Sequence, residues 1–162
     1  MSGVGEMQVV EFGLGNEVFA FPVSLVREIL DYAAPSHLPN GPAYFVGLTD
    51  LRGQGVPTVD FRRRLGLPVA EPTLATRILI LDVPLADRLL TLGVVIDRVL
   101  SVTSFEQAEI EPAPDIGIRW NSQYITGVVR RDTGFVVIVD AARIFTTEDA
   151  IAVRREGQLA NA

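Results

Sequence analysis

The sequence predicts a mainly β protein built from two related small barrels. Its apolar runs are roughly four to eight residues long, rich in valine and isoleucine, and bounded by turn residues, as short buried strands are. The 162 residues include 14 glycines and 10 prolines but only 7% aromatic residues, so short elements joined by turns are expected. A third observation, an internal repeat, predicts the number of barrels.

The last third of the chain repeats part of the first half. Tyr124–Val128 matches Tyr44–Leu48, and a strand followed by Asp140 matches a strand followed by Asp60, always at an offset of 80 residues. Self-similarity of this length predicts two homologous units. Each unit is expected to close as a small barrel, because closure removes exposed sheet edges.

The first unit, approximately residues 8–70, begins with a hairpin whose tight turn is Gly15-Asn16. Ser24 is expected to cap one helical turn after the hairpin, and Asp60 to cap a short helix that stops before Pro68. The expected strands are Gln8–Leu14, Glu17–Val23, Phe45–Leu48 and Val56–Val59.

The second unit, approximately residues 76–146, follows a linker rich in alanine, proline and threonine. Asp140 is expected to cap its short helix, as Asp60 does in the first unit. Residues 147–162 are predicted to form a C-terminal helix and tail, since acids lie in its first turn and Arg154-Arg155 in its last. The expected strands of the unit are Arg77–Val83, Leu89–Ile96, Asp97–Val102 and Val136–Val139.

Composition excludes most enzyme chemistries. All 14 positive residues are arginine, cysteine is absent, and His37 is the only histidine. Lysine Schiff bases, thiolate nucleophiles, disulfides and multi-histidine metal sites are therefore excluded, and no cofactor is expected. The net charge of -6 argues against nucleic-acid binding. With neither a signal peptide nor a long apolar segment, we expect a cytoplasmic protein without membrane insertion.

Carboxylate chemistry stays open as an alternative. Asp50, Asp60, Asp97 and Asp140 are available, and a small β-barrel hydrolase would gather such groups in a deep pocket. His37 lacks the nucleophile motif that a catalytic histidine would need. The expected roles of Asp60 and Asp140 are structural caps, because one explanation serves both repeat positions.

Two further features concern the charged residues. The run Arg62-Arg63-Arg64 is expected to form the solvated face of a short helix, with contact to a protein or an anion as the alternative. Glu28 lies among apolar residues, and Arg52 lies in a glycine turn. These two residues are either separate surface charges or part of a partner-binding surface in which a fork-shaped guanidinium supplements apolar contacts.

The longest motifs of the chain resemble those of the CheW-like chemotaxis coupling family. Gly47–Gly53 (GLTDLRG) and Val56–Arg62 (VPTVDFR) are similar to that family's signature. Phe19–Leu30, Gly93–Val99 and Ile110–Pro114 extend the resemblance to about residues 8–146. Asp50 stands where asparagine is usual, so its carboxylate is expected either to compete for Arg52 or to alter the receptor-binding face.

The resemblance implies two five-stranded SH3-like barrels packed side by side, as two intertwined halves of one domain over residues 8–146. It also implies a non-catalytic adaptor with two partners: the tip of a methyl-accepting chemoreceptor and the regulatory domain of a CheA-type histidine kinase. In isolation the protein is expected to be a monomer. The positions that match the family's receptor-binding residues are Val26, Glu28, Gly47, Arg52 and Leu92. An ion pair between Glu28 and Arg52 is expected. A scaffold for a pilus or surface-sensing pathway is an alternative.

Overall fold

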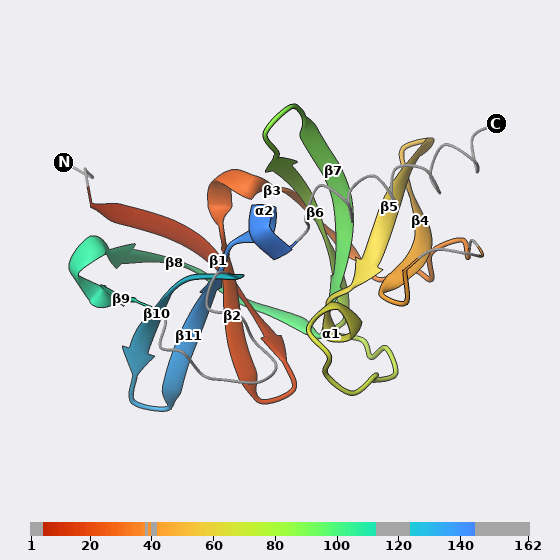
Figure 1. The fold of residues 1–162 in the computed structure, drawn as a ribbon. Coiled ribbons are helices and arrows are strands. Elements are labelled where there is room, and N and C mark those ends of the chain that lie inside the picture. Colours follow the sequence, from red (N-terminus) through yellow and green to blue (C-terminus); the bar gives the residue numbers. More distant parts are fainter. Residues whose placement is uncertain (1–4, 38, 40–41, 113–123, 145–162) are drawn as a thin grey trace.

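The computed structural model describes residues 5–37, 39, 42–112 and 124–144. The helix and tail predicted at 147–162 lie outside these residues. Figure 1 shows strands arranged in two groups that meet near the middle of the molecule. The elements are β1 (Glu6–Leu14), β2 (Glu17–Pro22), η1 (Val23–Leu25), β3 (Val26–Asp31), β4 (Phe45–Leu51), β5 (Gln54–Asp60), α1 (Phe61–Arg64), β6 (Arg77–Pro84), β7 (Leu89–Ile96), β8 (Arg98–Glu106), η2 (Gln107–Glu109), β9 (Ile110–Glu111), β10 (Ile125–Arg131), β11 (Gly134–Val139) and α2 (Ala141–Ile144).

The mainly β class is confirmed, but the two closed five-stranded barrels are not. The described strands form an open six-stranded sheet, in the order β8-β1-β2-β11-β10-β9, and an open five-stranded sheet, in the order β3-β6-β7-β5-β4. The sixth strand arises because the chain after β8 turns through η2 and pairs with β10 as β9. In the five-stranded sheet the corresponding contact is a single bridge between Ser36 and Leu48.

Each sheet takes strands from both halves of the sequence repeat. The hairpin β1–β2 of the first half lies in the six-stranded sheet, whereas the hairpin β6–β7 of the second half lies in the five-stranded sheet. The two sheets then share one strand order, and each contains one parallel pair, β2 with β11 and β5 with β7. The halves have exchanged their first hairpins, so neither half completes a sheet alone.

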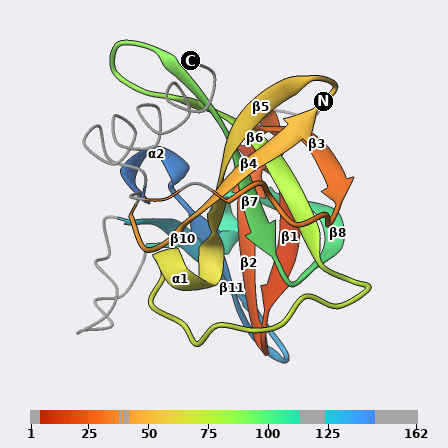
Figure 2. The same cartoon turned by 90° about the vertical axis from the view of Figure 1, so that its right-hand side faces the viewer.

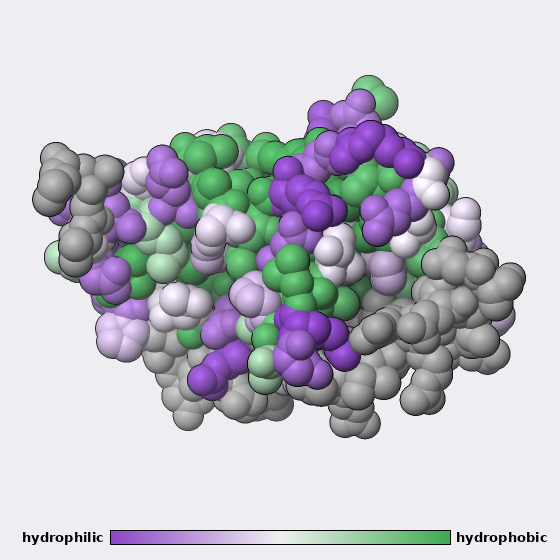
Figure 3. Space-filling model, turned by 90° about the horizontal axis from the view of Figure 1, so that it is seen from above, coloured by the Kyte–Doolittle hydropathy of each residue, from purple (hydrophilic) through white to green (hydrophobic). Residues whose placement is uncertain are grey.

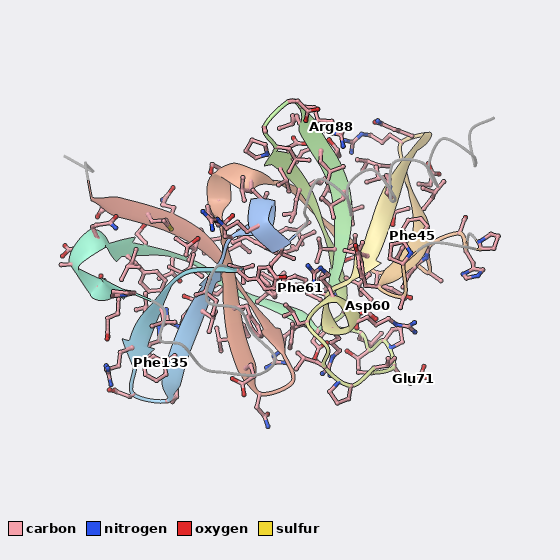
Figure 4. All side chains as sticks on the ribbon, viewed as in Figure 1. Phe45, Asp60, Phe61, Glu71, Arg88 and Phe135 are labelled. Atoms are coloured by element: carbon pink, nitrogen blue, oxygen red, sulfur yellow. The ribbon has the colours of Figure 1, made fainter. Side chains whose placement is uncertain are left out.

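The largest apolar cluster joins the two sheets. It includes Phe12 and Phe21 of the six-stranded sheet, Phe61 of α1 and Leu79 of the five-stranded sheet, each fully buried. The rings of Phe12 and Phe21 lie 5.1 Å apart, and those of Phe21 and Phe61 lie 5.5 Å apart. Figure 4 places Phe61 where the two groups of strands meet. Because of this shared cluster and the exchanged hairpins, we expect the described strands to unfold as one unit.

Both predicted caps are present. Asp60 precedes α1 and accepts a hydrogen bond from the Arg62 backbone N–H at 3.0 Å. Asp140 precedes α2 and accepts one from the Arg143 N–H at 3.2 Å. The expected cap at Ser24 is wrong, because η1 begins at Val23 and Ser24 lies inside the turn.

A partly buried ion pair links β1 to β10 in the six-stranded sheet. Glu11 of β1 is 1% exposed, and Arg131 of β10 donates to its Oε1 at 2.7 Å. Burial alone would raise the pKa of Glu11, but hydrogen bonds from Arg131 and Thr103 outweigh it and hold that pKa below its ordinary value of 4.5. Ionised Glu11 therefore stabilises the folded state.

Acid is expected to weaken the fold through Glu11. Because its pKa is lower in the folded than in the unfolded state, its contribution is complete above about pH 4.5 and is lost as the pH falls from there through the depressed folded value. Urea unfolding at a series of pH values measures this loss. Glu11→Gln should show a shallower dependence of the unfolding free energy on pH than the wild type in this range, and equal slopes would contradict the assignment.

Candidate partner-binding site

The hairpin turn between β4 and β5 presents Arg52 to solvent. Leu51 pairs with Gln54, so the turn has two residues, Arg52 and Gly53, with φ angles of 49° and 86°. Positive φ at both positions suits the right-handed twist of a hairpin, but it is uncommon for a residue other than glycine, asparagine or aspartate. Asp50 Oδ1 accepts the Gly53 N–H at 2.8 Å and holds the turn. The Arg52 side chain is 70% exposed.

The predicted ion pair between Glu28 and Arg52 is confirmed. Arg52 Nη1 donates to Glu28 Oε1 at 2.8 Å and to Oε2 at 3.2 Å. These hydrogen bonds and the carboxylate's charge raise the pKa of Arg52, which stays protonated. Glu28 is on β3 and Arg52 follows β4, the two edge strands of the five-stranded sheet. The sheet therefore curls until its edges approach each other.

Glu28 orients the Arg52 guanidinium but accepts hydrogen bonds from only one of its nitrogen atoms. Within the described part of the chain, Nε and Nη2 of Arg52 donate to no other group. The expected competition from Asp50 is wrong, because its carboxylate accepts the Gly53 N–H instead. A carboxylate or carbonyl of a partner can therefore accept hydrogen bonds from Nε and Nη2, whose planar arrangement suits such oxygen acceptors.

The other predicted receptor-binding residues lie in different surroundings. Val26 is half-buried and packs, with Leu25, against the shared apolar cluster. Leu92 is 1% exposed, because it lies on the face of β7 that packs into the shared apolar cluster. Leu92 cannot supply an exposed contact, and we remove it from the surface. We call Val26, Glu28 and Arg52 the Arg52 surface; Leu25 is the apolar neighbour that the motifs did not indicate.

The face that carries η1 and the β6–β7 turn is mixed in character. Seen from above, an apolar area lies beside a strongly hydrophilic one (Figure 3). Near Glu28, Arg27 pairs with Asp82 at 3.1 Å. Such a mixture of apolar anchors and oriented charges is typical of protein-binding surfaces.

Gly47 is buried and has a structural role. Its φ is +138°, and an added Cβ would lie 2.1 Å from the backbone oxygen of Ser36. That close approach allows Ser36 and Leu48 to exchange backbone hydrogen bonds of 2.8 and 2.9 Å. Gly47 therefore permits the only bridge that joins the chain after β3 to β4 in the described residues.

Gly47→Ala should destabilise the protein much more than Gly134→Ala. Both glycines have a φ of +138°, but nothing lies within 4 Å of a Cβ added at Gly134. The Gly134 variant should lose about 1–3 kcal/mol from backbone strain alone, whereas the Gly47 variant must also displace Ser36. Urea unfolding of both variants gives the comparison, and equal losses would show that the Ser36 contact is unimportant.

The arginine run is not a solvated helix face as expected. Arg62 Nε and Nη2 donate to Asp97 at 2.8 and 2.6 Å, and Nη1 donates to the Pro68 carbonyl at 2.9 Å. Arg64 lies where the two sheets meet, and its Nε donates to the carbonyl of Ile144 at 3.0 Å. Arg63, with a 43% exposed side chain, fits the expectation. Turned by 90°, the molecule shows α1 and α2 on one side (Figure 2).

The candidate carboxylates serve local structure. A cavity of about 230 Å³ beside α1 is lined by Asp60 and Asp97 among others, and Figure 4 shows Asp60 there, near the loop that carries Glu71. Asp97 Oδ2 also accepts the Gly15 N–H at 2.7 Å. Its pairing with Arg62 lowers the pKa of Asp97, whereas a general acid at neutral pH needs a raised one.

The fold consists of two β-sheets with strands exchanged between the halves, and the Arg52 surface combines an exposed arginine held by Glu28 with the half-buried Val26. No helix in the described residues is long and apolar enough to span a membrane. The sequence model of the CheW-like domain family matches residues 8–149, and the chain belongs to this family.

Relatives with known names agree with this membership. Chemotaxis protein CheW of Bacillus subtilis is 31% identical over 147 residues, which cover 90% of each chain. Chemotaxis protein CheW of Rhizobium meliloti is 29% identical over 145 residues, covering 90% of this chain and 91% of that one. The crystal structure of scaffolding protein TtCheW from Thermoanaerobacter tengcongensis has the same fold, with a TM-score of 0.77 at 21% identity over 91% and 93% of the two chains.

Proposed function

We propose that this chain is a non-catalytic adaptor that links the tip of a methyl-accepting chemoreceptor to the regulatory domain of a CheA-type histidine kinase. Membership of the CheW-like family makes it a chemotaxis coupling adaptor, which is favoured over a pilus or surface-sensing scaffold and over a carboxylate hydrolase. The proposal further places it in the cytoplasm, as a monomer in isolation, with residues 8–146 acting as one domain.

The observation that carries the proposal is the state of Arg52. Its backbone adopts a conformation that arginine seldom adopts, and Glu28 holds one side of its guanidinium while the rest faces solvent. Uncommon backbone geometry is found most often at functional sites. Together with half-buried Val26, this arrangement suits the side of a helix, which docks through an apolar anchor and a few rim contacts.

Separate titrations with the two partners test the proposal. The purified protein should bind a receptor-tip fragment and, independently, a fragment containing the kinase regulatory domain. Arg63→Ala is the matched control, because Arg63 is an exposed arginine away from the Arg52 surface, and it should bind both fragments as the wild type does. A wild-type protein that binds neither fragment would disprove the adaptor function.

A further inference from the structure

We infer that Arg64 is a positioning residue that locks the two sheets in one relative orientation, and that this lock is required to pass a receptor signal to the kinase. The second part rests on the proposed function. The first part depends only on the contacts of Arg64 and can be tested without either partner.

Arg64 joins the two short helices. It is the last residue of α1 and donates through Nε and Nη2 to the carbonyl oxygen of Ile144, the last described residue of α2. The planar guanidinium presents several N–H donors in a fixed geometry, so two of them can reach one carbonyl oxygen. The two helices follow β5 and β11, so this contact ties the five-stranded sheet to the six-stranded sheet.

Two tyrosines hold the same guanidinium. The Arg64 Cζ atom lies 5.4 Å from the ring centroid of Tyr44 and 5.4 Å from that of Tyr124. The carbonyl of Tyr44 accepts the Asp60 N–H at 2.8 Å, and that of Tyr124 accepts the Asp140 N–H at 2.9 Å. Each tyrosine is thus fixed to the cap of the helix in its own unit, and Arg64 contacts both units in equivalent ways.

The two repeats meet at this point and differ there. Tyr44 corresponds to Tyr124 at the repeat offset of 80 residues, and Arg64 corresponds to Ile144, whose carbonyl it binds. Equivalent positions therefore touch across the junction, but one carries a cation and the other an aliphatic side chain. A second arginine at position 144 would bring two like charges together, so a single arginine serves both units.

Arg64 adds contacts with a fixed geometry to a junction between the two sheets that is otherwise apolar. The shared cluster of phenylalanine and aliphatic side chains supplies most of the association between the sheets, and apolar burial has no preferred direction. A planar fork held by a carbonyl and by two aromatic rings does have one. The Arg52 surface lies in the five-stranded sheet, so a signal received there reaches the other sheet only if both sheets keep a fixed orientation.

A distance between the sheets tests the lock directly. The chain has no cysteine, so Gln54→Cys on β5 and Ser104→Cys on β8, both exposed, provide two unique sites for spin labels. Double electron–electron resonance should give a narrow distance distribution for the otherwise wild-type protein. Arg64→Met should broaden or shift it, Arg64→Lys should do so less, and Arg63→Met should leave it unchanged. An unchanged distribution in a folded Arg64→Met protein would overturn the inference.

The proposed role of Arg64 in signalling is tested by a measurement that a loss of stability alone would not change. Arg64→Met should bind the isolated receptor tip and the kinase fragment as the wild type does, yet lose roughly fivefold or more of receptor-dependent kinase stimulation, a usual size for coupling between sites. A parallel fall in both affinities would show a merely structural role and overturn this part. If the wild type binds neither partner, the proposed function fails, whereas the spin-label result still decides the first part.

Discussion

Arg52→Ala is expected to weaken binding of the receptor tip at least about tenfold, as loss of a central interface arginine typically does. The variant removes the exposed fork that Glu28 orients and leaves the Glu28 carboxylate facing solvent. The turn keeps its Cβ, and the Asp50 to Gly53 hydrogen bond that holds it is retained. The thermal midpoint and the affinity for the kinase fragment should therefore stay close to the wild-type values.

Titrations of the variants with the receptor tip distinguish the effect of the Arg52 charge from the effect of its orientation by Glu28. Glu28→Gln should weaken receptor binding less than Arg52→Ala, because the guanidinium remains but is less well held. Arg63→Ala controls for the loss of any exposed arginine from an acidic protein. If Arg52→Ala and Arg63→Ala bind the receptor tip equally well, the Arg52 surface is not the receptor site.

Phe61→Ala is expected to cost about 3–5 kcal/mol of unfolding free energy, the usual loss for a buried phenylalanine. Phe61 is fully buried, and its ring lies 5.7 Å from Phe12 and 6.4 Å from Phe19. The cavity would open in the cluster that both sheets share, where the neighbouring strands have little freedom to collapse. The loss should thus affect both sheets together.

Urea unfolding followed by fluorescence and by circular dichroism measures this effect. Phe135 is the matched control, since it is 48% exposed and lies near the turn between β10 and β11 (Figure 4). Phe135→Ala should change the unfolding free energy by no more than about 0.5 kcal/mol. Two separate transitions in Phe61→Ala, with one sheet retaining wild-type stability, would contradict a single shared core.

Local pattern predicted most of the strands, but not how they assemble. The tight turn at Gly15-Asn16 and the cap at Asp60 depend on neighbouring residues, and both are present. The exchange of hairpins depends on which strands pair across long separations, and the repeat is equally consistent with pairing within each half. The repeat therefore predicted two closed barrels, whereas the structure has two open sheets that each take strands from both halves.

Contacts were predicted where a motif resemblance indicated them and missed where only long-range packing decides them. Glu28 and Arg52 were paired through motif resemblance, and their ion pair is present. Leu92 was misplaced because the motif match does not say which face of β7 is buried, and Leu92 lies on the face that packs into the shared cluster. Arg62 and Arg64 resembled a solvated run, since their partners Asp97 and Ile144 lie 35 and 80 residues away in the sequence.

Bridging of two partners tests the central claim most directly. Beads that carry the receptor-tip fragment are mixed with the kinase regulatory-domain fragment, with and without the purified protein, and the kinase retained on the beads is measured. An adaptor should retain the kinase only when it is present, and Arg52→Ala should reduce that retention while still binding the kinase in solution. Kinase retention that does not depend on the protein, or no retention in its presence, would contradict the account.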